Sequence, residues 1–197
     1  MNQDIGRAIV FSMPVVSAAV SLILISLDTT RSSNTVDRKI HYNMIAVYCL
    51  MILFWSGLVM HSIARDTFIA YLPVFFSSFA FIPVFLYRIT HIITDTGERK
   101  LFTACHLLLP ACLTLIICAI ALAVPLRQRW AAIYDNEVNL TSAIIDITFI
   151  VCILLCILYS WLSLLRIKSY KRKIIDYSAD IYRMSLDWLS FICLLYT

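Results

Sequence analysis

Asp146 is the residue most able to do chemistry, because it is the only acidic residue inside a complete apolar run of this chain. A carboxylate within a membrane span is costly, so it is usually paired or serves a substrate or proton path. At 1.5 Å per residue, Asp146 lies only about 6 Å inside its run, within reach of the interface or of His61 and Arg65. Two interpretations stay open: a structural pair or interface-reaching carboxylate, and a ligand or proton site.

Other reactive residue types give weaker signals. His106 lies four residues before Pro110, and such a histidine more often bonds a carbonyl freed by proline than a metal. Cys152 and Cys156 share one helix face, which in an apolar helix favours close packing over redox work. All seven cysteines lie in apolar segments and no CxxC pair occurs, so no disulfide framework or metal site is indicated.

Enzyme signatures are absent from the sequence. It contains no HExxH, GxSxG, GxxxxGK[ST] or GxGxxG motif, and three glycines leave little material for a phosphate-binding loop. We therefore expect no enzyme activity, no catalytic residue and no cofactor.

The elements that carry these residues are predicted to be membrane-spanning helices. Hydrophobic residues make up 61% of the chain and charged residues 14%, against roughly 45–50% and 25% in soluble domains. About twenty consecutive apolar residues suffice to cross a bilayer as a helix. The predicted fold is an all-α polytopic bundle within residues 1–165, with five complete spans at 8–27, 43–63, 67–87, 101–123 and 142–165. The second and third spans should be antiparallel neighbours because three residues connect them.

Residues 166–186 are predicted to be a basic amphipathic linker. This segment holds six of the sixteen Lys and Arg residues, namely Arg166, Lys168, Lys171, Arg172, Lys173 and Arg183. From Ile167 through Ile174 and Ile181 to Phe191, apolar residues recur at alternating spacings of three and four. The stripe predicts either a seam that pairs two copies in a homodimer or a helix on anionic lipid headgroups or packed under the bundle.

The distribution of cations predicts the orientation. Twelve Lys and Arg residues follow the first, third and fifth spans, whereas four lie before the first span and after the even ones. Basic loops are retained in the cytoplasm, so the amino terminus, Arg65 and Arg129 are expected outside, with Lys100 and Lys171 inside. Arg127, Arg129, Trp130 and Tyr134 suit a segment at headgroup level. Residues 187–197 are apolar but too few to span, and we interpret them as the start of a truncated sixth span.

The carboxyl-terminal stretch resembles membrane-anchored AraC-type transcription regulators of bacteria. The residues that carry the resemblance are Tyr170 to Ile174, Tyr177 and Ser178, and Ser185 to Leu189. The resemblance implies a multi-pass sensory or anchoring domain in the bacterial inner membrane. It also implies a helix-turn-helix domain beyond Thr197, so this fragment itself would contact no nucleic acid. The alternative is a small multi-span transporter or a subunit of a membrane complex.

Overall fold

The computed structural model describes residues 2–31, 34–94, 105–135 and 140–175, which form six α-helices. Five of them are long and apolar enough to cross a membrane, which confirms the predicted helical bundle with five spans. The run at 187–197, the stripe beyond Ile175 and the side chains of Lys173 and Ile174 lie outside the described residues. The helices are α1 (Asn2–Arg31), α2 (Thr35–Ile63), α3 (Arg65–Ile93), α4 (Cys105–Ala123), α5 (Leu126–Tyr134) and α6 (Leu140–Ile175).

Most spanning helices extend beyond their apolar runs. Helix α2 begins at Thr35, eight residues before its predicted span, and its N-cap Asn34 accepts a hydrogen bond from the Val36 amide at 3.1 Å. Charged residues such as Arg38 and Lys39 lie before the apolar run, but their helix propensity is as high as that of most residues. The apolar run therefore indicates the membrane-crossing part of such a helix, and the whole helix is longer than the run.

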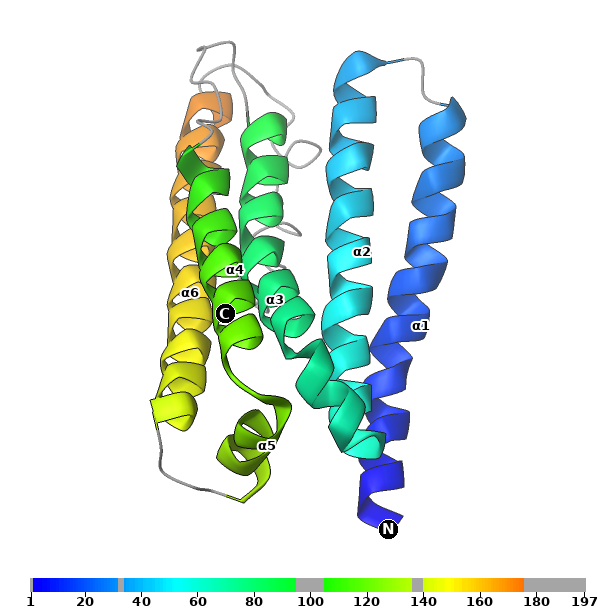
Figure 1. The fold of residues 1–197 in the computed structure, drawn as a ribbon. Coiled ribbons are helices and arrows are strands. Elements are labelled where there is room, and N and C mark those ends of the chain that lie inside the picture. The colour runs from blue at the N-terminus through cyan, green and yellow to red at the C-terminus, as the bar shows by residue number, and fades with distance from the viewer. Residues whose placement is uncertain (1, 32–33, 95–104, 136–139, 176–197) are drawn as a thin grey trace.

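Helices α2 and α3 are joined through a single residue, Ala64. The Ala64 amide donates to the Met60 carbonyl at 2.8 Å, and the Ala64 carbonyl accepts from the Phe68 amide at 3.0 Å. The backbone hydrogen bonds of both helices therefore extend to the linking residue, with no loop between them. The two helices pack as antiparallel neighbours, as predicted (Figure 1).

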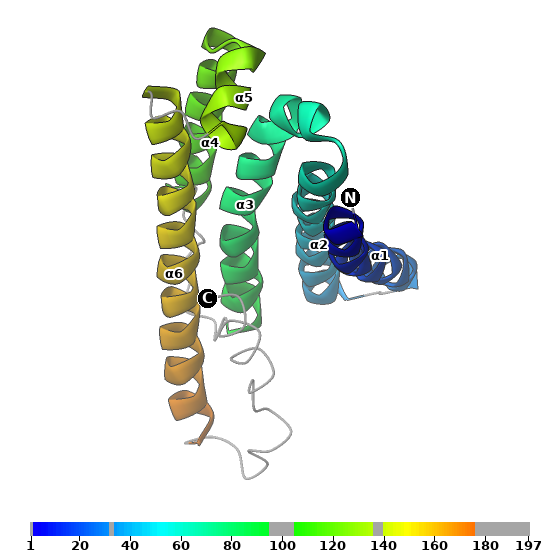
Figure 2. The ribbon, with the colours of Figure 1, turned by 90° about the horizontal axis from the view of Figure 1, so that it is seen from below.

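Helix α3 is the common neighbour in this bundle. It contacts α2, α4, α5 and α6, whereas α1 packs against α2 at the edge of the molecule (Figure 2). In its lower half α3 changes direction, leaving α2 and joining α4 and α6 (Figure 1). Pro73 lies in this half, and a proline inside a helix is a usual cause of such a bend.

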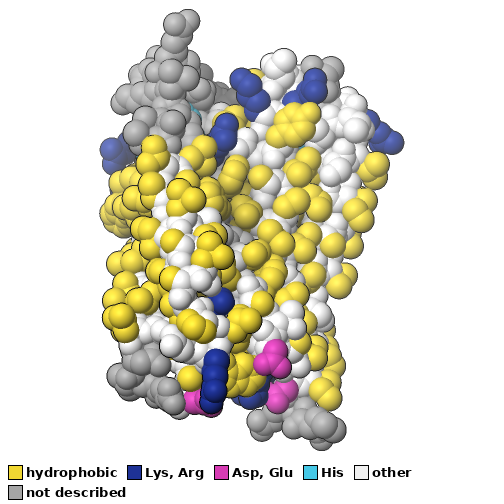
Figure 3. Space-filling model, in the orientation of Figure 1, with side chains coloured by type: hydrophobic (Ala, Val, Ile, Leu, Met, Phe, Trp, Pro, Cys, Tyr) yellow, Lys and Arg dark blue, Asp and Glu magenta, His cyan; other side chains and the backbone are white. Residues whose placement is uncertain are grey.

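On the face that Figure 3 shows, the middle of the bundle is mostly apolar and most charged side chains lie toward its two ends. The amino terminus and α5 lie at one end, which we call the amino-terminal end; the last turn of α6 lies at the other (Figure 1). Four described Lys and Arg side chains belong to the amino-terminal end, Arg7, Arg65, Arg127 and Arg129. Eight belong to the opposite end, which we call the basic end: Arg31, Arg38, Lys39, Arg88, Arg166, Lys168, Lys171 and Arg172.

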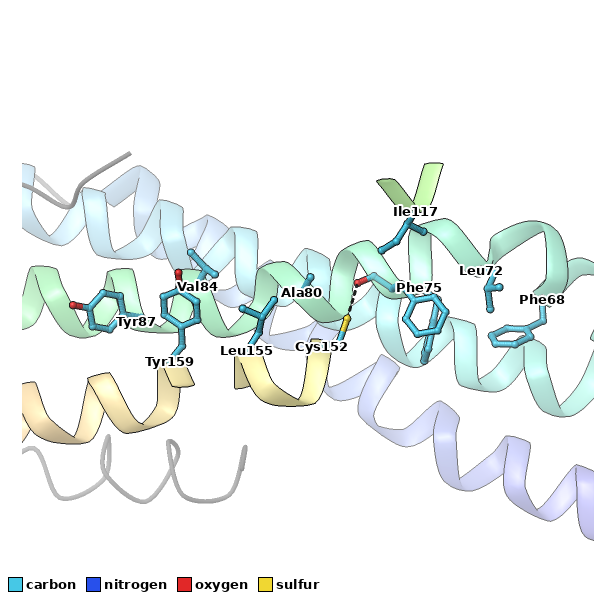
Figure 4. Close-up of a cluster of buried hydrophobic side chains, with 11 residues drawn as sticks. Phe68, Leu72, Phe75, Ala80, Val84, Tyr87, Ile117, Cys152, Leu155 and Tyr159 are labelled. Carbon is cyan, nitrogen blue, oxygen red and sulfur yellow. Dashed lines mark hydrogen bonds between the residues drawn. The ribbon is translucent and has the colours of Figure 1, made fainter. Parts of the chain in front are cut away.

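The core is built around α3 and α6. One buried cluster runs along α3 and includes Leu155 and Tyr159 of α6 and Ile117 of α4; Val84 lies beside Tyr159, and Leu72 lies further along α3 (Figure 4). Ala80 and Cys152, both 0% exposed, are small enough to let the two helices approach closely. Cys152 and Cys156 are buried free thiols on the face toward α3, so close packing is the role that the structure gives them.

Candidate functional site

Arg129 reaches from α5 to a backbone carbonyl that Pro73 leaves free in α3. Proline has no amide hydrogen, so the carbonyl four residues earlier, that of Ile69, loses its helical partner. The Arg129 Nη1 atom donates to this carbonyl at 3.1 Å. Buried carbonyls need a hydrogen-bond donor. A side chain from another helix supplies that donor at the bend of α3.

The side chains of Arg129 and Arg127 differ in burial. Arg129 is 8% exposed and buried in the bundle, while Arg127 is exposed; the headgroup level of their segment stays a prediction. Both residues lie on α5, where a two-residue step rotates the side chain by about 200°. One face of this short helix therefore points toward α3, and the other points away from the bundle.

A second proline-freed carbonyl is satisfied in the same way at the other end of the bundle. Pro110 removes the partner of the His106 carbonyl, and the Tyr159 hydroxyl of α6 donates to that oxygen at 3.2 Å. The His106 ring also meets the Tyr159 hydroxyl, with 3.4 Å between Nδ1 and the oxygen. The carbonyl that Pro110 leaves free is that of His106 itself, and Tyr159 donates to it; a bond from the His106 ring to a freed carbonyl stays a prediction.

His61 and Arg65 converge on Tyr134 at the amino-terminal end. The His61 Nδ1 atom and the Tyr134 hydroxyl share a hydrogen bond of 2.8 Å. The Arg65 guanidinium lies over the Tyr134 ring, 5.2 Å from its centroid, in a cation–π contact. A hollow of about 500 Å³ adjoins these side chains and is also lined by Asp4 and Arg7 of α1.

The pKa of the Tyr134 hydroxyl is raised in this cluster. Burial raises its pKa above the ordinary value, the Arg65 charge opposes this shift and Asp66 adds to it. The phenol therefore keeps its proton at neutral pH and remains able to share a hydrogen bond with His61.

Asp146 does not join this cluster. Its side chain is exposed on α6, it does not line the hollow, and no ion pair links it to His61 or Arg65 among the described residues. The structural pairing that the sequence left open is therefore not formed in the described part of the chain. The reason is rotational: α6 turns Thr148 and Cys152 inward, which leaves Asp146 facing outward.

The basic segment is anchored at its first turn. Helix α6 continues without a break past the predicted boundary at 165, and Arg166 Nε donates to the Thr94 hydroxyl at 2.8 Å. Ile167, 1% exposed, packs with Ile93, Leu164 and Tyr170. The beginning of the stripe is thus packed against the bundle itself, while Lys168 and Arg172 remain exposed.

Sequence reasoning missed Arg129 and Tyr159 as the partners of the bent helices. A usable signal exists in the positions four residues before Pro73 and Pro110, because each marks a carbonyl that needs a donor. The sequence does not reveal which distant side chain supplies that donor.

Comparison with known proteins adds no relationship: no family model, curated protein or solved structure matches this chain.

Proposed function

We propose that this chain is a membrane-embedded sensing and anchoring domain whose sixth helix relays changes from the amino-terminal end to the basic end. The observation that carries the proposal is the continuity of α6, a single helix of 36 residues from Leu140 to Ile175. Its apolar part is long enough to cross a membrane, and its last turns carry exposed cations. A continuous helix moves as a rod, so displacement at one end reaches the other.

Contacts at both ends of α6 support the relay. Near its start α6 packs against α5, which presents Arg129 and Tyr134, and α5 also contacts α3. Near its end, the Arg166 and Ile167 contacts fasten α6 to the last turn of α3. A ligand or lipid change felt by α5 would therefore act on two helices that meet again at the basic end.

The finer part of the proposal concerns orientation and output. The excess of cations at the basic end favours a cytoplasmic location for that end, with the amino terminus outside. The resemblance of residues 170–189 to AraC-type regulators supports a DNA-binding domain as the receiver of the signal, in a bacterial inner membrane. Anionic lipid headgroups would then hold Lys168, Lys171 and Arg172 at the membrane surface.

Chromatin immunoprecipitation with the product of the intact gene tests this function. The protein should carry an epitope tag at its amino terminus, and membrane insertion should be checked by alkaline extraction. Enrichment of discrete promoter regions is expected. A correctly inserted protein that enriches no DNA, from a gene encoding no helix-turn-helix downstream of Thr197, would contradict the regulator proposal.

A subunit of a membrane complex is the second candidate, and Asp146 favours it. This carboxylate is exposed among Ile147, Phe149 and Ile150, all at least 46% exposed, on a helix face that would otherwise meet lipid. Burial against a partner helix would remove that cost. Asp146→Asn should then dissociate a higher-mass species on native gels, whereas Asp135→Asn, exposed at the end of α5, should not. A single monomer band for the parent protein argues against this candidate.

A further inference from the structure

We propose that Arg129 and the cavity beside it bind a small monovalent anion, either chloride or the carboxylate group of a short organic acid. The cavity measures about 30 Å³ and lies where α3, α4, α5 and α6 meet. Arg129 lines this cavity together with two residues that bear hydroxyl groups, Thr141 and Thr148. Apolar residues also line it, among them Pro73, Ile117 and Ile145.

The uncompensated charge of Arg129 is the observation that calls for an anion. Its Nη1 atom donates to the Ile69 carbonyl, but its buried Nε–H has no hydrogen-bond partner. No acidic side chain lines the cavity, and Arg129 makes no ion pair among the described residues. A buried cation is stable only when it is paired and its donors are satisfied. Arg129 lines the adjoining cavity, so an anion held there would lie beside this unpaired charge.

The size of the cavity selects the ligand. One water needs about 10–15 Å³ by the same kind of measure, so about 30 Å³ accommodates roughly two water-sized atoms. Chloride fits this space, and so do the two oxygens of a carboxylate, which match the fork of a guanidinium.

Other groups around the cavity agree with a single small anion. The buried Thr141 side chain lines the same space, and its hydroxyl is a neutral donor. The Thr148 hydroxyl already donates to the Ile144 carbonyl at 2.7 Å, so it is committed to its own helix. The remaining lining residues are apolar, which strengthens the attraction between Arg129 and an anion by lowering the local dielectric.

Anion binding at this position would bridge the bend of α3 to the beginning of α6. Pro73 and Thr141 line the same cavity, and Arg129 comes from the helix between α4 and α6. The bound anion would therefore tighten three elements at once. This inference goes beyond the proposed function and does not depend on it, because it follows from an unpaired charge and a cavity.

Thermal unfolding in phosphatidylcholine nanodiscs tests the proposal. Chloride or acetate should replace gluconate at constant ionic strength, with tryptophan fluorescence as the readout. A ligand that binds only the folded state stabilises it by mass action, so the parent protein should show a saturable rise in Tm of about 2–5 °C. Arg129→Met should abolish the rise, whereas Arg127→Met, on the exposed face of the same helix, should retain it.

Direct binding to the unmodified protein provides a measurement that does not depend on the variant folding. The protein should broaden the chloride-35 magnetic resonance line beyond empty nanodiscs, and acetate but not gluconate should reverse the broadening. Stronger competition by acetate than by excess chloride would identify a carboxylate as the preferred ligand. The absence of excess broadening, or an equal rise in Tm in Arg129→Met, would overturn the proposal.

Discussion

Four prolines lie inside the described helices, Pro14, Pro73, Pro83 and Pro110. At Pro73 and Pro110, a side chain of another helix donates to the backbone carbonyl that the proline leaves free. Arg129 of α5 bonds the carbonyl freed by Pro73, and Tyr159 of α6 bonds the one freed by Pro110. Within a membrane an unsatisfied carbonyl costs several kcal/mol. The same two bonds therefore stabilise bent helices and connect them to α5 and α6.

Tyr159→Phe should destabilise the protein by roughly 1–3 kcal/mol, because it leaves the His106 carbonyl without a donor. The loss should shrink in a Pro110→Ala background, where residue 110 regains an amide hydrogen that can reach the same carbonyl. Unfolding by sodium dodecyl sulfate in mixed micelles, followed by circular dichroism, measures both effects. Equal losses in the two backgrounds would show that the Tyr159 hydroxyl does not act through this carbonyl.

At alkaline pH, the stability of Tyr134→Phe should fall less steeply with rising pH than the stability of the parent protein. Burial raises the pKa of Tyr134, so the folded state holds the phenol proton more tightly than the unfolded state does. This contribution to stability is complete below the ordinary pKa of about 10 and falls as pH rises toward the raised pKa. Tm measured from about pH 9 to 11 should fall less steeply in Tyr134→Phe than in the parent protein. Parallel slopes in the two proteins would refute the assignment.

At the scale of the elements, the contact between α2 and α3 depends on a glycine. A Cβ atom at Gly57 would lie 2.6 Å from Phe75 Cδ2 and 3.3 Å from Tyr71 Cε1. The Phe75 ring cannot easily move aside, because it stacks on Phe54 with centroids 4.9 Å apart and meets Phe68 at 5.7 Å. Gly57 thus sets how closely the hairpin formed by these helices can pack.

Gly57→Ala should destabilise the protein by roughly 1–3 kcal/mol through overpacking, which exceeds the gain in helix propensity of about 0.5–1 kcal/mol. Gly6→Ala is the matched control, because nothing lies within 4 Å of a Cβ atom at that position of α1. Unfolding in mixed micelles should therefore show a lower free energy of unfolding for Gly57→Ala and an unchanged or slightly higher one for Gly6→Ala. A stabilised Gly57→Ala would mean that α2 and α3 can separate without loss.

At the scale of the whole molecule, charge is divided unevenly between the ends of an apolar bundle. The basic end carries eight described cations, and the amino-terminal end carries four, of which Arg129 is buried. The burial of Arg129 removes one cation from the solvent-facing count at the amino-terminal end. The uneven division of cations between the two ends is the observation on which the proposed orientation rests.

Cysteine labelling should place Arg127 outside and Lys168 inside. Both side chains are exposed, so an impermeant maleimide can reach them, whereas Arg129 is too buried to report on topology. In a cysteine-free background, Arg127→Cys should be labelled in intact spheroplasts and Lys168→Cys only after permeabilisation. The reverse pattern would invert the orientation and place the basic end outside the cell.

Properties of consecutive residues determined the class of this protein, its five spans and the antiparallel pairing of α2 and α3. Apolar runs long enough to cross a bilayer form helices there, because no other local structure satisfies their backbone groups. The connection predicted from the sequence, three residues from Ala64 to Asp66, is short enough to make the two spans antiparallel neighbours; the structure shortens it to Ala64. The uneven distribution of Lys and Arg is likewise readable from the chain alone.

The tertiary structure alone decided which side chains meet. The rotation of α6 leaves Asp146 exposed, and the rotation of α5 turns Arg129 inward to the Ile69 carbonyl. Hydropathy does not specify these rotations, because they follow from packing between residues far apart in sequence, such as Ala80 against Cys152. The prolines mark where donors are needed, and only the packed bundle determines that Arg129 and Tyr159 supply them.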